Sequence, residues 1–384
     1  MRCSHSRSLS ASGGPFLAPS ATRRGLGLWP GLWLVAALAA AGCGPSAADH
    51  PLAADIGHWS AVLRSHAAND RDWVQIQQSA QPGLDSAREA LRHGRRELAL
   101  ARLAGVRVDI GAAAYVRERS PEQRQSTAAF AAEWKRMRGP LGDDHGPPSP
   151  AALAGVRPAV ARAMGEAALL QVRGYYQASL DYGRSTTPQS GLHYLGTAQA
   201  LRQLVSFCRT LAEDFPQGRE PRLRSLDAEL AGLQAEVLAA YRPPAALDHH
   251  ADFIGVGSLL KEARELNAAG LRHGALLRYL QASLAMTPLR PAAAVRDAGA
   301  LERRLREADA RLDAGEVDHS IGRLFLEMAQ AHLARSGPGA SAATAAAILG
   351  DVLPRYFAAL GPAPRMAPQP VPAVTVTLVR WPYT

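Results

Sequence analysis

The chain has 384 residues, 47% of them hydrophobic, and a formal net charge of +9. This length and hydrophobic content suffice for one large or two medium domains with a packed core, so the fold should not depend on covalent staples. The positive charge is spread along the chain, and no basic block is long enough to form a nucleic-acid-binding stripe. We therefore predict no nucleic-acid partner.

The first distinctive segment is a short apolar run that ends in small residues and a cysteine, Trp29–Cys43. Two arginines stand just ahead of it, and no acidic residue occurs before Asp49. A basic start, a short apolar core and a small-residue end are typical of a secretory signal. The apolar core is shorter than the roughly 20 residues that span a bilayer. We predict a signal peptide over residues 1–42 and a tether to the folded part over 43–52.

The last four residues of the run, Ala40-Ala41-Gly42-Cys43, resemble the lipobox of bacterial lipoproteins. In that family the cysteine is lipidated and becomes the first residue of the mature chain. The resemblance implies that Cys43 is the lipid attachment site and that the chain is anchored in the bacterial cell envelope. Because Gly44 rather than an aspartate follows, it implies the outer membrane, with the protein facing the periplasm. Ala39-Ala40-Ala41 also fits an ordinary cleavage site, so secretion without a lipid is the alternative.

Cysteine usage agrees with export. Cys3 would leave with the signal and Cys43 would carry lipid, so Cys208 would be the one cysteine left and no intramolecular disulfide could form. Cys208 lies in an apolar stretch, and we predict that it is a small buried core residue rather than a nucleophile.

The rest of the chain is dominated by apolar residues at helical spacing. No alternation of strands and helices occurs that would build a parallel sheet. Short connections make successive helices antiparallel neighbours, so we predict an all-α fold of stacked antiparallel helical hairpins. The predicted helices are 53–67, 85–91, 97–119, 120–138, 160–182, 192–215, 222–241, 253–268, 275–286, 292–313, 317–334 and 342–360, the last broken near Pro354.

Two architectures for these hairpins stay open, an irregular bundle and a short solenoid. The segment Leu266–Met286 resembles a tetratricopeptide hairpin, with small Ala269, turn residue Gly274, and Tyr279 and Ala282 at aromatic and small positions. The resemblance implies a regular tetratricopeptide-like array, whereas the uneven spacing of the other segments favours a bundle.

Breaker-rich stretches suggest the boundaries of larger units. Gly139–Pro150 has no apolar periodicity, so we predict a linker over 139–150, between an N-terminal helical region (53–138) and a main helical region (151–361). Residues 362–384 are expected to form a proline-rich extended tail that contains one β-strand. This strand would lie across a helical groove or, alternatively, add to the sheet of a partner.

Tyrosines gather in one part of the chain, since four of the nine fall between residues 175 and 194. If the two helices of this region form a hairpin, their polar aromatic groups converge at one end. We predict a ligand or partner surface suited to a protein, peptide or glycan. Its residues would be Tyr175, Tyr182, Arg184, His193 and Tyr194. The alternative is that the tyrosines only hold the hairpin together while Ser190 caps a helix.

The best candidate for metal chemistry is weak. Asp248-His249-His250 superficially matches the Asp-His-His motif of a phosphoesterase family, but the further acidic motifs of that family are missing. His249, His250 and Asp252 could form a surface metal site, although adjacent helical residues point about 100° apart. We predict no metal and no cofactor.

The sequence contains no nucleophile elbow, phosphate-binding glycine loop or haem attachment motif. We therefore predict a lipid-anchored helical binding or scaffold module for a protein, peptide or glycan partner, without catalysis. The alternative is a periplasmic enzyme or metal-binding protein. It would require a shared pocket for His193, Asp248, His249, His250 and His319.

Overall fold

The computed structural model describes residues 51–65, 71–143, 149–185, 187–211, 215, 218–243, 247–290, 298–314, 316–334 and 340–361. The predicted signal peptide, the lipid attachment residue Cys43, nearly all of the predicted tether and the C-terminal tail with its strand lie outside these residues.

Over the described residues the fold is all-α, as the sequence predicts. Extended pairing there is limited to one parallel bridge between Arg219 and Val317. None of the helices described combines the length and the apolar character needed to cross a membrane. The α-helices are α1 (Pro51–Ser65), α2 (Arg71–Arg92), α3 (Arg96–Arg117), α4 (Pro121–Gln125), α5 (Thr127–Arg136), α6 (Ala159–Ser185), α7 (Pro188–Thr210), α8 (Asp227–Ala240), α9 (His250–Ala268), α10 (Arg272–Ala285), α11 (Ala298–Asp313), α12 (Ser320–Ala334), α13 (Ala340–Ala347) and α14 (Leu353–Ala359).

Short 3-10 or π-helical turns accompany these helices. They are η2 (Gly139–Asp143), η3 (Pro150–Leu153), η5 (Leu247–His249), η6 (Thr287–Leu289) and η7 (Ile348–Val352).

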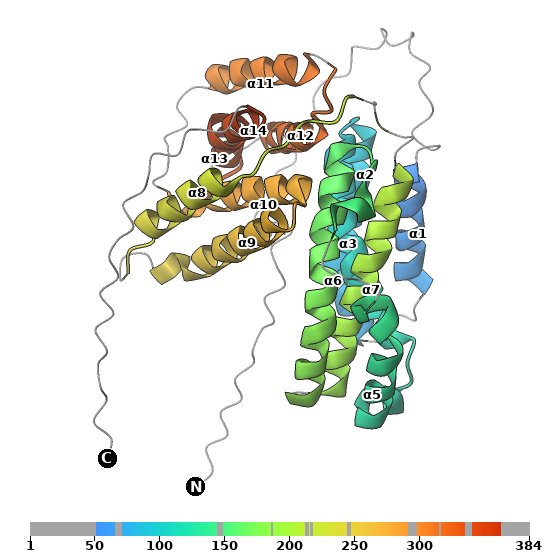
Figure 1. Cartoon of the computed structure of the whole chain (residues 1–384). Coiled ribbons are helices and arrows are strands. Elements are labelled where there is room, and N and C mark those ends of the chain that lie inside the picture. The colour runs from blue at the N-terminus through green and yellow to red at the C-terminus, as the bar shows by residue number, and fades with distance from the viewer. Residues whose placement is uncertain are drawn as a thin grey trace, which may run out of the picture.

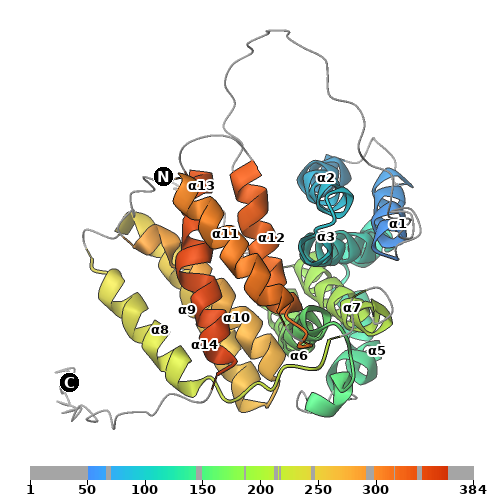
Figure 2. The same ribbon diagram turned by 90° about the horizontal axis from the view of Figure 1, so that it is seen from above.

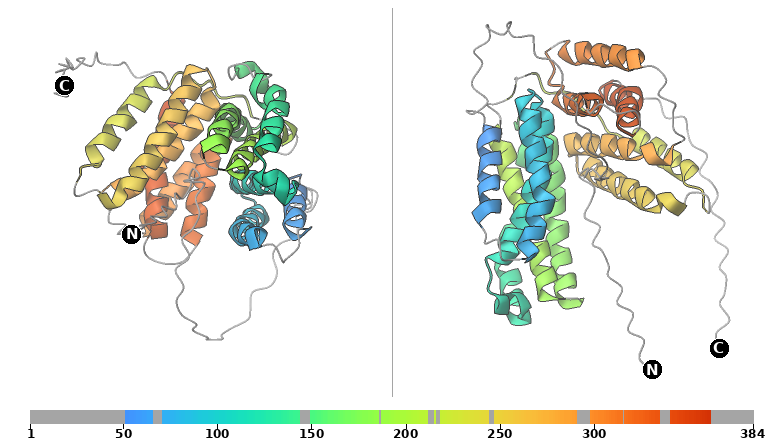
Figure 3. Two further views of the ribbon diagram at one scale, coloured as in Figure 1. Left: turned by 90° about the horizontal axis from the view of Figure 1, so that it is seen from below. Right: turned by 180° about the vertical axis from the view of Figure 1, so that it is seen from behind.

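The helices form two groups that cross each other (Figure 1). The first group contains α1, α2, α3, α6 and α7, which run roughly side by side with α5 packed at one end; the second contains α8 to α14. Seen from above, the first group is viewed end-on and the second lengthwise (Figure 2), and the same crossing is visible from behind (Figure 3). The groups meet where α6 packs on α10 and α12, and where α3 packs on α12. Within the groups, α2–α3, α6–α7 and α9–α10 are the predicted antiparallel hairpins.

Helix α6 lies at the centre of the molecule. All but one of residues 158–169 are buried, and the buried set includes Ala159, Ala161, Ala163 and Ala167. Small side chains on every face let α7, α10 and α12 approach α6 from different sides. Alanine in this helix therefore serves close packing as well as helix propensity.

The direction of the helices changes after α7, not at residues 139–150, where the sequence predicts a linker. Leu141 in this stretch is fully buried, and Ser149 caps η3 through the backbone N–H of Ala151. Helices on the two sides of the stretch also pack together, since α7 lies against α3 and α5.

Two prolines, Pro82 and Pro354, have different effects on their helices. Helix α2 continues through Pro82, where Gly83 gives the close approach to α3: a Cβ on Gly83 would lie 2.2 Å from Cγ2 of Val106. Pro354 occupies the first turn of α14, where its missing N–H costs little, and the π-helical turn η7 carries the chain into it. Tertiary packing therefore overrides the helix-breaking tendency of Pro82, so α2 extends well ahead of the predicted 85–91. The predicted break near Pro354 is confirmed, since η7 separates α13 from α14.

Conversely, one predicted helix is divided in two. Ser120 and Gln123 form a capping box at the start of α4, with Pro121 at the first helical position. Ser126 then acts as a second cap, accepting a hydrogen bond from the N–H of Ala129, so α5 starts on a new axis. This change of direction brings α5 onto the turn end of the α6–α7 hairpin.

Where the two groups meet, buried side chains of one cap helices of the other. Asp318 accepts hydrogen bonds from the N–H of Ala159 at the start of α6 (2.6 Å) and from the N–H of Ser320 at the start of α12 (2.9 Å). The Ser320 hydroxyl in turn accepts from the N–H of Val160 (3.0 Å). In the opposite sense, Glu166 on α6 accepts from the N–H of Gly274 in α10 (2.8 Å).

A third such contact joins α3 to α12. Glu327 accepts a hydrogen bond from the N–H of Leu98 in the first turn of α3 (2.7 Å) and is also hydrogen-bonded to Glu97. The side chains of Glu97 and Glu327 are both buried. Such an arrangement requires one of the two carboxyl groups to keep its proton.

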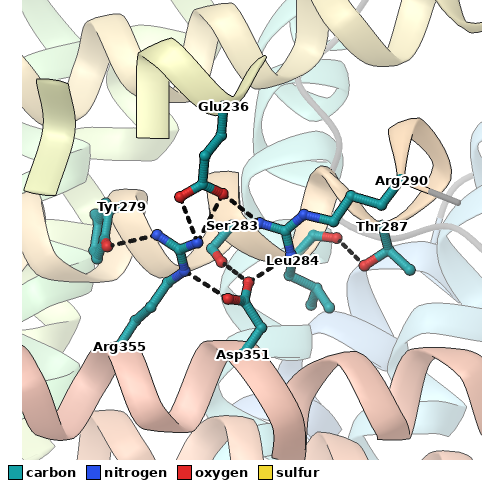
Figure 4. A network of polar contacts seen from close by, with 8 residues as sticks. All are labelled: Glu236, Tyr279, Ser283, Leu284, Thr287, Arg290, Asp351 and Arg355. Carbon is teal, nitrogen blue, oxygen red and sulfur yellow. Dashed lines mark hydrogen bonds and ion pairs between the residues drawn. The ribbon is translucent and has the colours of Figure 1, made fainter. Parts of the chain in front are cut away.

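A polar network holds α8 to the rest of the second group (Figure 4). Arg355 pairs with Glu236 of α8 and with Asp351 of η7, each at 2.8 Å. Arg290 contacts the same two carboxylates, at 2.8 and 2.7 Å, and Ser283 of α10 donates to Asp351. Two guanidinium groups and two carboxylates are thus matched one to one.

The turn end of the α6–α7 hairpin gives the first prediction. A Cβ on Gly191 would lie 2.6 Å from Cε2 of Phe130 and 2.7 Å from the Cα of Gly183. Gly191→Ala should therefore lower the free energy of unfolding by about 1–3 kcal/mol, measured by urea denaturation. Gly232→Ala is the matched control: nothing lies within 4 Å of its Cβ position, so this change should be neutral or stabilising. Equal effects of the two substitutions would contradict the close approach.

The Glu97–Glu327 contact gives a prediction about pH. Burial and the hydrogen bond with Glu97 raise the pKa of Glu327 well above its ordinary value of 4.5. The native state keeps this proton where the unfolded chain has lost it, so this contact loses stability as the pH rises above 4.5. Glu327→Gln retains both hydrogen bonds without a titrating proton. Between pH 5 and 8.5 the wild type should lose at least about 1 kcal/mol more stability than Glu327→Gln.

Denaturant unfolding at the two pH values measures this difference. Glu302→Gln, a change at an exposed glutamate, is the control and should follow the wild-type pH dependence. Parallel curves for wild type and Glu327→Gln would show that Glu327 is ionised in the native state.

Candidate functional site

Three of the predicted tyrosines come together on α6 and α7. The rings of Tyr182 and Tyr194 stack with centroids 4.2 Å apart, and Tyr175 lies on the other side of Tyr194 at 5.7 Å. Burial and hydrogen bonding with Tyr182 raise the pKa of Tyr194 to about 12, so its phenol is neutral. We call these three residues the tyrosine row. The predicted convergence is therefore confirmed for them.

A shallow pocket of about 290 Å³ adjoins the tyrosine row where α6 faces α9. Tyr175 and Tyr194 form its aromatic part, and Glu262 and Glu265 of α9 form its acidic part. Its remaining lining residues are Leu170, Gln171, Gly174 and Ala178. The row thus continues as an aromatic surface into a polar depression, which suits a ligand with both apolar and hydrogen-bonding groups.

The two carboxylates of the pocket have different surroundings. Glu262 accepts from the amide of Gln171 at 3.1 Å and pairs with the Nε of Arg278 at 2.8 Å. Among the described residues, the carboxylate of Glu265 forms one ion pair, with Lys261 at 3.9 Å, and the two side chains are 48% and 77% exposed, respectively. An exposed pair of this kind is weak, so Glu265 is available to a positively charged group of a ligand.

The other two predicted residues of this surface are placed less centrally. His193 contacts Tyr194 edge-on, with ring centroids 6.3 Å apart. Arg184 is exposed near the end of α6 and forms no hydrogen bond or ion pair with any residue that the structure describes. His193 therefore borders the tyrosine row, while Arg184 is close to the row only along the sequence.

Contacts made by other residues hold the hairpin together. Of the four tyrosines only Tyr176 is buried; it stacks on Trp134 of α5 at 5.0 Å and donates to its carbonyl. Phe130 packs against Gly183 and Gly191 at the turn end of the hairpin. The cap of α7 is Thr187, which accepts from the N–H of Ser190, so the predicted cap at Ser190 is wrong. Contacts outside the tyrosine row thus hold the hairpin together alongside the stack of Tyr182 on Tyr194.

The candidate metal ligands do not converge. His249 contacts Asp252 at 3.1 Å, whereas His250 bonds to the hydroxyl of Tyr241 at 2.7 Å. His319 lies elsewhere, 2.9 Å from the hydroxyl of Tyr356. The described part of the chain holds no group of three or more His, Cys, Asp or Glu side chains placed to bind a metal ion. The shared pocket required by the alternative function is not formed by these residues.

Cys208 is fully buried, as predicted. Burial raises the pKa of its thiol to about 12, so it is protonated and unreactive in the folded protein.

The sequence could not identify the α9 side of the pocket. Glu262 and Glu265 lie three positions apart on α9, and nothing in the local sequence of this helix distinguishes them from solvent-exposed glutamates. The contact of Gln171 with Glu262 joins positions 91 residues apart.

Comparisons with protein-family models, curated proteins and solved structures found no match to this chain.

Proposed function

We propose that this chain is a lipid-anchored protein of the bacterial envelope that binds a protein or peptide partner through the tyrosine row and its adjoining pocket. The observation that carries the proposal is the exposed stack of Tyr182 on Tyr194, with Tyr182 42% exposed. Tyrosines with an apolar face and a polar edge are enriched in protein interfaces because they lose little conformational entropy on binding.

Charge narrows the class of partner. The ionisable side chains of the pocket lining, apart from its phenols, are the carboxylates of Glu262 and Glu265. A peptide segment with a lysine or arginine next to an apolar residue would place its charge at Glu265 and its apolar group on the tyrosine row. This complementarity favours a basic peptide segment over a neutral glycan.

Site-specific crosslinking tests the proposal. A photo-crosslinking phenylalanine analogue at position 182, in the full chain expressed in its envelope, should give a discrete crosslinked protein species. Tyr194→Ala in the same background should reduce this species severalfold, because an aromatic stack contributes about 0.5–1.5 kcal/mol. The control places the analogue at Leu238, an exposed apolar residue of α8, and should not give the same species. Identical products at the two positions, or none at 182, would refute the tyrosine row as a partner surface.

The anchor is tested separately. Cys43→Ser should abolish incorporation of radiolabelled fatty acid and shift the protein from the outer-membrane fraction to the soluble periplasmic fraction, because an acylated chain needs its lipids for stable attachment. Wild-type protein that is soluble and unlabelled would instead support ordinary secretion.

A further inference from the structure

A second, larger cavity of about 440 Å³ lies at the turn between α9 and α10. Its walls come from the first turn of α6, the segment that precedes α8 and the α9–α10 turn. The lining residues are Arg162, Glu220, Pro221, Arg222, Leu223, Gly270, Arg272 and His273. We call this cavity the arginine pocket. Gly270 makes its turn with a φ of +75°, a conformation that favours glycine.

Positive charge in the arginine pocket is not matched by its lining. Three guanidinium groups and one carboxylate face it, in contrast to the one-to-one network of Arg290 and Arg355 in Figure 4. Clustered guanidinium groups repel one another unless an anion lies among them. The unequal count therefore favours a negatively charged ligand.

The three arginines differ in how they are held. Arg162 pairs with Glu166 and Glu220, so it is already neutralised. Arg272 donates through one Nη to the carbonyl of Leu223 at 2.6 Å, which fixes the guanidinium without cancelling its charge. Arg222 is exposed and makes no hydrogen bond or ion pair within the described residues. Arg222 and Arg272 are thus the charges available to a ligand.

His273 supplies an unsatisfied polar atom. Its side chain is 5% exposed, and its Nε2 is buried without a hydrogen-bond partner in the part of the chain that is described. The nearest carboxylate oxygen, on Glu220, is 3.7 Å away, beyond hydrogen-bonding distance. A buried polar atom without a partner is unfavourable, and a ligand atom that hydrogen-bonds to it would relieve this cost.

Two further observations define the chemistry. Burial and the charges of Arg162 and Arg157 lower the pKa of His273 to about 3, so the imidazole is neutral and offers a hydrogen bond rather than a charge. In the first turn of α10 the N–H groups of His273 and Gly274 are also taken up by Glu166. A ligand would therefore be held by guanidinium groups and not by the helix end.

We propose that the arginine pocket binds a small multivalent oxyanion, a phosphate ester or a polycarboxylate, with Arg222 and Arg272 as the charged donors and His273 Nε2 as a neutral hydrogen-bonding group. Guanidinium groups form paired hydrogen bonds with both kinds of oxyanion. The site shares no lining residue with the pocket beside the tyrosine row, whose nearest residue on α6 is Leu170, 8 positions or about 12 Å along the helix from Arg162.

Calorimetric titration of the full chain at constant ionic strength tests the proposal, with pyrophosphate and citrate as probes. At least one probe should bind with a Kd below about 1 mM. Arg222→Gln/Arg272→Gln should weaken binding by about tenfold or more, since the variant loses both charged hydrogen-bond donors to the oxyanion. The control is Arg173→Gln/Arg264→Gln, which removes two exposed arginines outside the pocket and should bind like wild type.

The outcomes of the titrations distinguish a phosphate ester from a polycarboxylate as the ligand. Binding of pyrophosphate alone assigns a phosphate ester, and binding of citrate alone assigns a polycarboxylate. Arg222→Gln by itself is the variant for which misfolding is no concern, because Arg222 is exposed and unpaired; it should weaken binding with an unchanged thermal midpoint. Absence of binding by both probes, or equal weakening in the control variant, would overturn the proposal.

Histidine ring resonances give a second readout. In ¹H–¹⁵N spectra the bound probe should shift the Nε2 signal of His273 and leave that of His193, beside the tyrosine row, unchanged. Probe binding without a shift at His273 would place the oxyanion outside the arginine pocket.

Discussion

The structure depends on the capping of buried helix ends across the crossing of the two helical groups. The first N–H groups of a helix have no partner within it, and burying them unpaired costs several kcal/mol in total. Asp318 satisfies α6 and α12 together, Glu166 satisfies α10, and Glu327 satisfies α3. Because each hydrogen bond works only over a narrow range of distance and angle, these contacts fix how one group lies on the other.

This geometry also determines where ligands can bind. Helix α6 contributes Arg162 to the arginine pocket and Tyr175 to the other pocket, so both depressions follow the line along which α6 meets α9 and α10. Near Glu166 the helices are held close by the cap. Farther along α6 the contact changes to Gln171 with Glu262, and then to tyrosines. The contacts near Glu166 thus lie at the middle of the α6 contact with α9 and α10, and the two pockets lie on either side of it.

Local features were predictable from the sequence and distant ones were not. The all-α fold, the capping box at Ser120, the buried Cys208 and the convergence of the tyrosine row follow from spacing along the chain. The pairing of Leu98 with Glu327 joins positions 229 residues apart, and no local pattern marks it. At Pro82, packing of α2 against α3 outweighs the helix-breaking tendency of proline. Glu262 and Glu265 of α9 form a pocket only because α6 packs beside them, which the local sequence of α9 does not indicate.

The excess of positive charge in the arginine pocket differs from the treatment of arginine in the rest of the described fold. Elsewhere in the described residues, buried guanidinium groups are compensated: Arg107 pairs with Asp55 at 2.8 Å and lies over the ring of Phe207 at 4.3 Å. Arg278 pairs in the same way with Glu262. Compensation of this kind is what folding requires, because an unpaired buried charge is strongly destabilising. Arg222 and Arg272, at the rim of the arginine pocket, are exposed and stay solvated without a ligand, so the fold can tolerate their charges. Packing alone, however, does not explain why these arginines lie around the buried Nε2 of His273.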